Sequence, residues 1–182
     1  MAGKCYLCGL LCFCLDSHIV IMHYFLNIGS NIGNRKLNIS RALKALEEEF
    51  GYFEVSKLVE SRPWGYVSDR MYYNIAIMVI SDKEPLQMLN ILQGIENRLN
   101  PTPHRDASGN YQDRVLDIDI MAADEISLDS DNLTLPHPAL AERRFFLEPF
   151  AELAPLWRHP LSGKTCAEML ADLPAEREES KG

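Results

Sequence analysis

The second half of the chain contains the run Arg114-Val115-Leu116-Asp117-Ile118-Asp119-Ile120-Met121. This alternation predicts a β-strand, in which successive side chains point to opposite faces. Asp117 and Asp119 then share a face, about 7 Å apart at the backbone, and Leu116, Ile118, Ile120 and Ala122 form the other. Neighbouring carboxylates repel each other unless a cation neutralises them. The run therefore predicts either a site for Mg²⁺ and polyphosphate or a half-exposed edge strand with an acidic solvent face.

The residues upstream predict the order β-α-β-β-α-β between residues 22 and 123. Apolar periodicity favours strands over residues 23–30, 52–59 and 72–80, and helices over 39–50 and 85–99. Gly51 ends the first helix, and Gln93 and Glu96 lie off the apolar stripe of the second. This order is the ferredoxin-like arrangement, an α+β fold with an antiparallel sheet, both helices on one face and the active site on the other. Asn74 is expected on the same open face as the two aspartates.

Further elements are expected as C-terminal additions to this core. They are a strand pair within residues 125–135, a helical stretch over 139–153 and a short helix over 166–173. Residues 100–113 read as a polar loop that leads into the acidic strand. We expect one domain over residues 22–174 and a charged tail over 175–182.

The first 21 residues stand apart because they hold Cys5, Cys8, Cys12 and Cys14 in a short apolar run. The charged start and short apolar stretch resemble a signal peptide, and the cysteine spacing matches no zinc site. Since Met22 opens a natural first strand, we expect residues 1–21 to be a disordered leader or a mis-called start. The remaining Cys166 has no evident partner, which is typical of a reducing compartment and suggests the cytoplasm.

Bulk composition narrows the possible partners. With 182 residues and a formal net charge of −8, the chain is not expected to be a dedicated nucleic-acid binder, since phosphate backbones attract basic surfaces. No apolar stretch reaches the roughly 20 residues of a membrane span. We expect a monomer that binds small molecules.

Basic and aromatic residues near the acidic strand are candidates for phosphate and ring binding. Phosphoryl transfer needs cationic groups to absorb developing charge, while a flat heterocycle can be stacked between aromatic rings. Each residue type also has a purely structural explanation. Surface arginines usually interact with solvent, a histidine between prolines is often a turn residue, and isolated aromatic residues usually belong to the core. The candidates are Arg105, Arg114, Arg143, Arg144, His137, Trp64, Tyr72, Tyr111 and Phe145.

Several short motifs follow one another between about Tyr24 and Pro160. They are Gly29-Ser30-Asn31, Tyr73-Asn74, Gln93 with Glu96, the run from Asp113 to Met121, Leu133-Thr134-Leu135-Pro136-His137-Pro138 and Arg143-Arg144-Phe145. In this order the motifs resemble one enzyme family, 6-hydroxymethyl-7,8-dihydropterin pyrophosphokinase of folate synthesis.

The resemblance implies transfer of pyrophosphate from the co-substrate ATP to the pterin hydroxymethyl group, with release of AMP. It implies that Asp117 and Asp119 bind two Mg²⁺ ions. The implied pterin site consists of Asn74, Trp64, Gly65, Tyr72, Tyr111 and Phe145, supported by Glu96. The implied ATP contacts are Arg114, His137, Arg143, Thr134 and Gln93, with Arg105 in place of a basic residue usual in the family.

The chain departs from the family pattern at two places. Residues 100–105 read Asn-Pro-Thr-Pro-His-Arg where the family often has a glycine and two arginines, and Asn132 stands where an arginine is frequent. Two other functions stay open on the sequence. One is a non-catalytic ferredoxin-like module that binds a ligand or partner, and the other is a transferase that uses ATP with a different hydroxylated acceptor.

Overall fold

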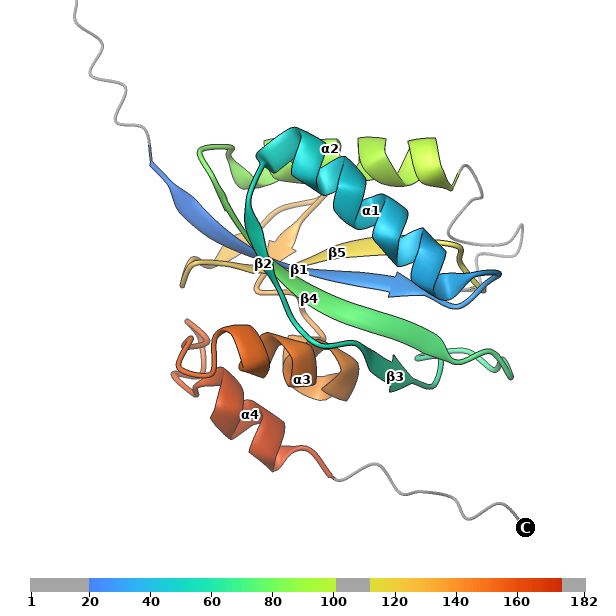
Figure 1. The fold of residues 1–182 in the computed structure, drawn as a ribbon. Helices are drawn as coiled ribbons and strands as arrows, with labels where there is room; N and C mark the ends of the chain where they lie inside the picture. Colours follow the sequence, from blue (N-terminus) through green and yellow to red (C-terminus); the bar gives the residue numbers. More distant parts are fainter. Residues whose placement is uncertain (1–19, 101–111, 175–182) are drawn as a thin grey trace, which may run out of the picture.

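One antiparallel sheet organises the protein, whose computed structural model describes residues 20–100 and 112–174 (Figure 1). The strands lie in the order β2-β4-β1-β5, with β3 also paired to β4, which confirms the ferredoxin-like prediction. Their bounds are β1 Met22–Ser30, β2 Phe53–Val55, β3 Val59–Ser61, β4 Tyr72–Ser81 and β5 Asp117–Ala123.

The prediction of one continuous strand over residues 52–59 is wrong. It is divided into β2 and β3, because the pairing with β4 shifts by one residue between Val55, opposite Ile77, and Val59, opposite Asn74. Ser56 lies at the break, where its Oγ accepts a hydrogen bond of 2.9 Å from the Ala76 N–H. A side chain thus replaces a backbone carbonyl in the ladder, which the alternation of the sequence does not reveal.

Helices α1 (Arg35–Phe50) and α2 (Pro85–Leu99) cover one face of the sheet. The Asn34 side chain caps α1 by accepting from the Leu37 N–H, and Gly51 ends it at a φ of 74°, as its position predicts. The core between helices and sheet contains the apolar faces of both helices, including Ile39, Leu46, Met88, Leu92 and Ile95, together with Leu26, Ile28, Ile77 and Ile118.

The opposite face carries a second apolar cluster under α3 (Arg144–Leu153) and α4 (Cys166–Asp172). Phe25, Met121 and Phe150 belong to it. The helical stretch predicted over residues 139–153 is interrupted, since the short 3₁₀ helix η1 (Leu140–Glu142) ends at Arg143, which is extended. The Arg143 carbonyl then accepts from Phe146 and Leu147, which begins α3.

The acidic strand differs from its prediction at both ends. β5 begins at Asp117 rather than Arg114, because the Arg114 backbone is hydrogen-bonded to Asn31 outside the sheet. Near its other end the register with β1 shifts, so that Ala122 lies opposite Phe25 and Ile120 opposite Leu26. Ala122 therefore joins the cluster under α3 and not, as predicted, the face of Ile118 and Ile120.

The remaining strands form a small separate sheet. β6 (Leu128–Asp129) pairs with β7 (Thr134–Leu135), as predicted for residues 125–135.

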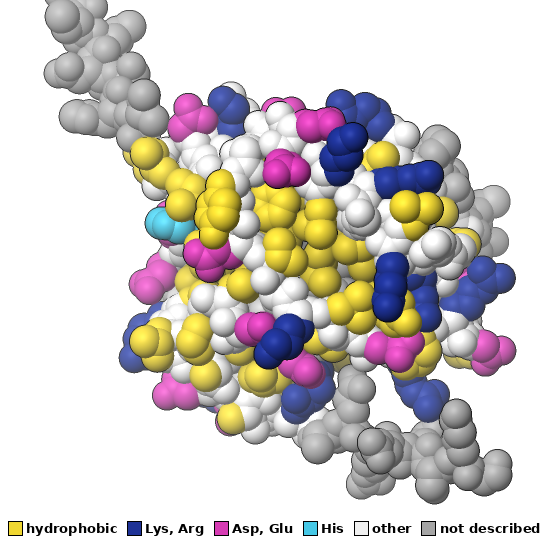
Figure 2. Space-filling model, in the orientation of Figure 1, with side chains coloured by type: hydrophobic (Ala, Val, Ile, Leu, Met, Phe, Trp, Pro, Cys, Tyr) yellow, Lys and Arg dark blue, Asp and Glu magenta, His cyan; other side chains and the backbone are white. Residues whose placement is uncertain are grey.

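On the side of the molecule where β2 lies in Figure 1, apolar side chains reach the surface between the helical layers (Figure 2). Tyr52, Val55 and Ile80 are exposed. Among the helices of residues 20–100 and 112–174, none has the length and apolar character needed to cross a membrane.

Candidate active site

Three adjacent strands place polar side chains side by side on the sheet face opposite α1 and α2. Gly29 on β1 lies between Asn74 on β4 and Asp117 on β5. Two residues earlier, Asn27 lies next to Asp119. Because side chains two residues apart share a face of a strand, these positions form a compact polar patch.

Gly29 leaves room for the Asn74 side chain at the centre of this patch, because it has no side chain of its own. A Cβ at residue 29 would lie 3.0 Å from the Oδ1 atom of Asn74, closer than such atoms normally approach. Asn74 itself is buried, and its Nδ2 donates a hydrogen bond of 2.9 Å to the Ser61 Oγ. The amide is thereby held with Oδ1 over the glycine.

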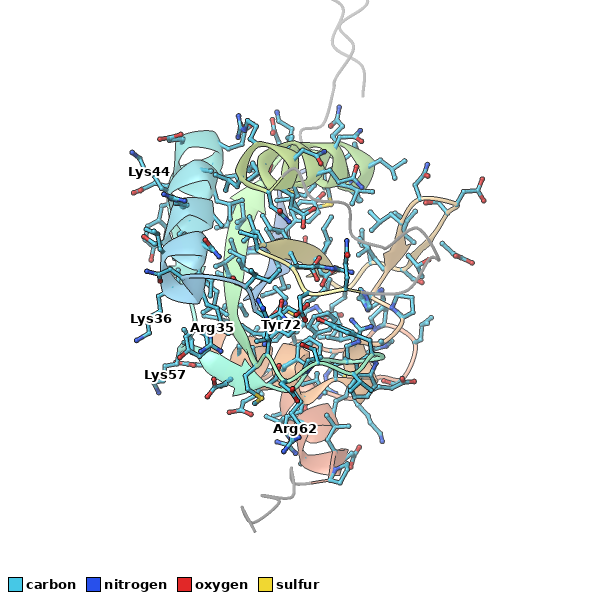
Figure 3. The ribbon with its side chains drawn as sticks, turned by 90° about the vertical axis from the view of Figure 1, so that its right-hand side faces the viewer. Arg35, Lys36, Lys44, Lys57, Arg62 and Tyr72 are labelled. Carbon is cyan, nitrogen blue, oxygen red and sulfur yellow. The ribbon has the colours of Figure 1, made fainter. Side chains whose placement is uncertain are left out.

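A pocket opens over the patch. In Figure 3, Tyr72 lies between the layer of α1 and α2 and the layer of α3 and α4, and Arg62 lies farther out. The aromatic part of the lining consists of Trp64, Tyr66, Tyr72 and Phe145. The charged or titratable part consists of Arg62, Arg114, Asp117, Asp119, His137 and Arg143.

The two carboxylates have different surroundings. Asp117 forms an ion pair with the guanidinium of Arg114. Asp119 is half-buried, and removal from water together with the nearby charge of Asp117 raises the pKa of the Asp119 carboxyl well above its usual range. A cation between the two carboxylates would offset both their mutual repulsion and the cost of removing Asp119 from water. In the described part of the chain no group of three or more His, Cys, Asp or Glu side chains gathers into a metal cluster.

His137 is held in one orientation and in the neutral form. Its Nδ1 accepts a hydrogen bond of 3.1 Å from the Ala139 N–H, and its own backbone N–H donates to the Met121 carbonyl. Burial and the charge of Arg143 lower the pKa of His137 to about 4. With Nδ1 accepting, the neutral ring carries its proton on Nε2, which can donate to a phosphate oxygen.

Arg143 lies among aromatic rings at the edge of the pocket. Its guanidinium carbon is 5.9 Å from the centroid of the Trp64 ring, 5.7 Å from that of Phe145 and 5.1 Å from that of Phe146. Its Nε atom is buried and has no hydrogen-bond partner among the residues that the structure describes. The side chain thus retains donor capacity for an anionic ligand.

A second pocket adjoins the first. Its lining is mixed, with apolar residues such as Leu89, Ile120 and Leu133 and the polar residues Ser130, Asp131, Asn132 and Thr134. Asp119 and His137 line both pockets. A ligand in each pocket would therefore meet the other at these two side chains.

A hydrogen-bond network ties the loop of Trp64 to the start of the acidic strand. Asn31 Nδ2 donates to the Asp113 carboxylate at 2.7 Å and to the Tyr66 hydroxyl at 3.2 Å. Asn31 Oδ1 accepts from the Arg114 N–H at 2.7 Å. Asn31, the residue that follows β1, thus connects two loops that are far apart in the sequence.

The structure brings together nine of the predicted site residues in the first pocket: Trp64, Tyr72, Asn74, Arg114, Asp117, Asp119, His137, Arg143 and Phe145. Thr134 lines the second, and Gly65 follows Trp64 with a φ of 79°. Gln93 is exposed on α2 and lines neither pocket. Arg144 donates to the carbonyls of Leu173 and Pro174 instead. Arg105 and Tyr111 lie outside the described residues.

Glu96 lies elsewhere than its position off the helical stripe suggests. It is only 5% exposed, and its Oε1 accepts a hydrogen bond of 2.7 Å from the Ile118 N–H. Ile118 separates the two aspartates, so Glu96 fixes the strand that carries them. Five further residues line the first pocket that were not predicted from the sequence: Asn27, Gly29, Ser61, Arg62 and Tyr66. Asn27 has a detectable signal, since it is a polar residue on an otherwise apolar strand, as Asn74 is.

Comparisons with known proteins point to one family. Residues 25–155 match the family model of 7,8-dihydro-6-hydroxymethylpterin-pyrophosphokinase, HPPK. The 2-amino-4-hydroxy-6-hydroxymethyldihydropteridine pyrophosphokinase of Porphyromonas gingivalis is 36% identical over 138 residues, which cover 75% of this chain and 92% of that relative. The folic acid synthesis protein FOL1 of Dictyostelium discoideum is 33% identical over 150 residues, 82% of this chain but 22% of that protein.

Solved structures show the same fold at low sequence identity. A Plasmodium falciparum HPPK-DHPS chain superposes with a TM-score of 0.65 at 14% identity, covering 84% of this chain and 43% of that one. The chain thus spans less than half the length of that HPPK-DHPS chain. On the match over residues 25–155 and the identity with full-length relatives, the chain belongs to the 7,8-dihydro-6-hydroxymethylpterin-pyrophosphokinase family.

Proposed function

We propose that the chain transfers pyrophosphate from ATP to the hydroxymethyl group of 6-hydroxymethyl-7,8-dihydropterin and releases AMP, as a step of folate biosynthesis. Membership of the family supports this reaction. The observation that carries it is the meeting of two pockets at Asp119 and His137, because two substrates must bring their reacting ends together.

The first pocket suits a pterin. Trp64, Tyr72 and Phe145 offer ring surfaces to a flat heterocycle. Asn74 offers an amide whose orientation is fixed by Ser61, so that it can hydrogen-bond the polar edge of the pterin. Specific polar contacts of this kind select one heterocycle among others of similar size.

The second pocket suits the nucleoside part of ATP. Its apolar residues can contact the adenine, and the Thr134 hydroxyl can hold the nucleotide by a hydrogen bond. The triphosphate would then lie across Asp119 and His137. Arg114, Arg143 and the Nε2–H of His137 are donors that can bind its oxygens and stabilise charge that develops during transfer.

Asp117 and Asp119 would hold Mg²⁺, and we propose two ions at this pair. When bound, the ions neutralise phosphate charge and align the β-phosphate for attack. The pterin hydroxyl oxygen forms a bond to the β-phosphorus, the bond from that phosphorus to the oxygen bridging the α-phosphate breaks, and the hydroxyl proton is released. AMP departs with the bridging oxygen.

We propose that residues 22–174 act as one domain and that the active form is a monomer. Cys166 is buried and forms no disulfide with any residue in the described part of the chain, which supports a reducing compartment such as the cytoplasm.

Product analysis tests the reaction. The protein is incubated with ATP, Mg²⁺ and the hydroxymethyl pterin, and nucleotides are separated by chromatography. Formation of AMP that depends on the pterin supports pyrophosphoryl transfer. Formation of ADP would instead indicate a transfer of one phosphate, and an absence of turnover with intact ligand binding would favour a non-catalytic module.

A further inference from the structure

Asn27 is a buried polar residue with an unused acceptor. It lies in the middle of β1, is 2% exposed and lines the first pocket. Its Oδ1 atom is buried and has no hydrogen-bond partner in residues 20–100 and 112–174. Buried amide oxygens are nearly always paired, so an unpaired one at a pocket wall points to a ligand.

The neighbours of Asn27 on the sheet face cannot satisfy this oxygen. Ala76 lies opposite it on β4 and offers only a methyl group. Gly29, two residues along β1, has no side chain. Asp119 lies opposite on β5, and directly opposed side chains in an antiparallel pair have Cβ atoms about 5 Å apart. When Asp119 is ionised, an amide oxygen and a carboxylate are thus adjacent, and neither oxygen offers a proton or positive charge to the other.

We infer that Asn27 Oδ1 is a third protein oxygen at the cation site of Asp117 and Asp119, where it binds the divalent ion or one of its water molecules. The inference rests on the proposed function, since it assumes that the two aspartates hold Mg²⁺. Hard divalent cations take carboxylate, amide carbonyl and water oxygens as ligands, which is the set of groups that β1 and β5 place together.

Two substitutions separate the oxygen from the rest of the side chain. Asn27→Leu keeps a similar volume and removes the oxygen, whereas Asn27→Asp keeps an oxygen and removes the N–H. If Asn27→Leu does not fold, Asn27→Ala replaces it. Asn38→Ala is the matched control, because Asn38 lies on α1, donates to Ser30 and Ile32 and does not line the pocket.

Mn²⁺ serves as the probe, and its free concentration is followed by electron paramagnetic resonance. Each protein is titrated alone and with α,β-methylene ATP, which cannot transfer pyrophosphate. We expect Asn27→Leu to weaken Mn²⁺ binding by about tenfold, the effect typical of lost groups around a metal. Asn27→Asp should bind at least as tightly as the wild type, and Asn38→Ala should match it.

Equal Mn²⁺ affinity in Asn27→Leu and wild type would overturn the inference, as would equal weakening by Leu and Asp, which would assign the effect to the amide N–H. These results leave the proposed function intact if the wild type binds Mn²⁺ and forms AMP. Failure of the wild type to bind Mn²⁺ even with the ATP analogue would overturn both proposals.

Discussion

Gly29 and Asn74 face each other across β1 and β4, and the space above the glycine is where the Asn74 amide points. A methyl group at residue 29 would meet Asn74 Oδ1 at 3.0 Å. Since Asn74 Nδ2 is bonded to Ser61, the amide cannot turn away without losing that hydrogen bond. The glycine thus determines how Asn74 is presented to a ligand.

Gly29→Ala should lower pterin affinity while the protein still folds. The added methyl shifts the Asn74 amide, and a displaced hydrogen bond to the pterin corresponds to about a tenfold loss of affinity. Isothermal titration with the pterin measures the effect. Gly94→Ala is the control, because nothing lies within 4 Å of a Cβ there, and it should bind as the wild type does. Unchanged binding in Gly29→Ala would contradict this role.

Asn74→Ala should reduce pterin affinity further. Hydrogen bonds to a ring edge that are left unmade cost about 1–3 kcal/mol, or one to two decades in affinity. Ser61→Ala should lower pterin affinity by a smaller factor than Asn74→Ala, since it leaves the Asn74 amide in place but free to rotate. Fluorescence titration of both variants checks the order. Wild-type pterin affinity in Asn74→Ala would indicate another acceptor for the pyrophosphate.

Glu96 is expected to stabilise the acidic strand. Glu96→Ala removes the acceptor of the Ile118 N–H and leaves a buried donor unpaired, which costs about 1–3 kcal/mol. Glu96→Gln keeps an acceptor at the same distance along the side chain and should lose less. Urea denaturation gives the free energy of unfolding for each variant. A loss in Glu96→Gln as large as in Glu96→Ala would show that the Ile118 hydrogen bond is not the cause.

His137 should make stability depend on pH on the acidic side. Its pKa is about 4 in the folded protein and 6.5 when unperturbed, so between these values the unfolded chain binds the extra proton. The contribution of neutral His137 to the free energy of unfolding is fully present above pH 6.5 and is lost as pH falls toward 4. Between pH 6.5 and 5 the wild type should lose about 2 kcal/mol through this group.

The comparison with His137→Gln isolates that effect, because glutamine does not titrate. Free energies of unfolding are measured in urea at pH 7 and pH 5 for both proteins. The wild type should lose more stability than the variant on acidification. The same decrease in the two proteins would mean that His137 is not held neutral.

The order of the elements and most of the candidate site could be predicted from the sequence because both depend on strong local patterns. The period of two at Asp117 and Asp119 and the polar interruption at Asn74 place these side chains on one face, and the structure confirms that placement. The break at Ser56 and the shift at Ala122 were missed, since a one-residue change of register arises from pairing between strands and not from either strand alone.

The remaining site residues depend on tertiary contacts. Glu96 has the helical position of a surface residue, yet it is buried because the Ile118 N–H needs an acceptor there. Asn31 connects loops separated by more than 80 residues in its hydrogen bonds to Asp113 and Arg114, which no spacing rule reveals. Asn27 is the exception among these residues. Like Asn74, it is a polar residue among apolar residues of a strand, and this local pattern can be recognised in the sequence.

The central claim is that Asp117 and Asp119 support transfer of pyrophosphate to a pterin, and AMP formation by the wild type, Asp117→Asn and Asp119→Asn tests it most directly. Asp124→Asn is the control, since Asp124 bonds to His23 and does not line the pocket, and its φ of 43° suits asparagine. We predict that the wild type and Asp124→Asn form one AMP for each pterin diphosphate, whereas Asp117→Asn and Asp119→Asn fold but form none. Full AMP formation by either of these two variants would contradict the account.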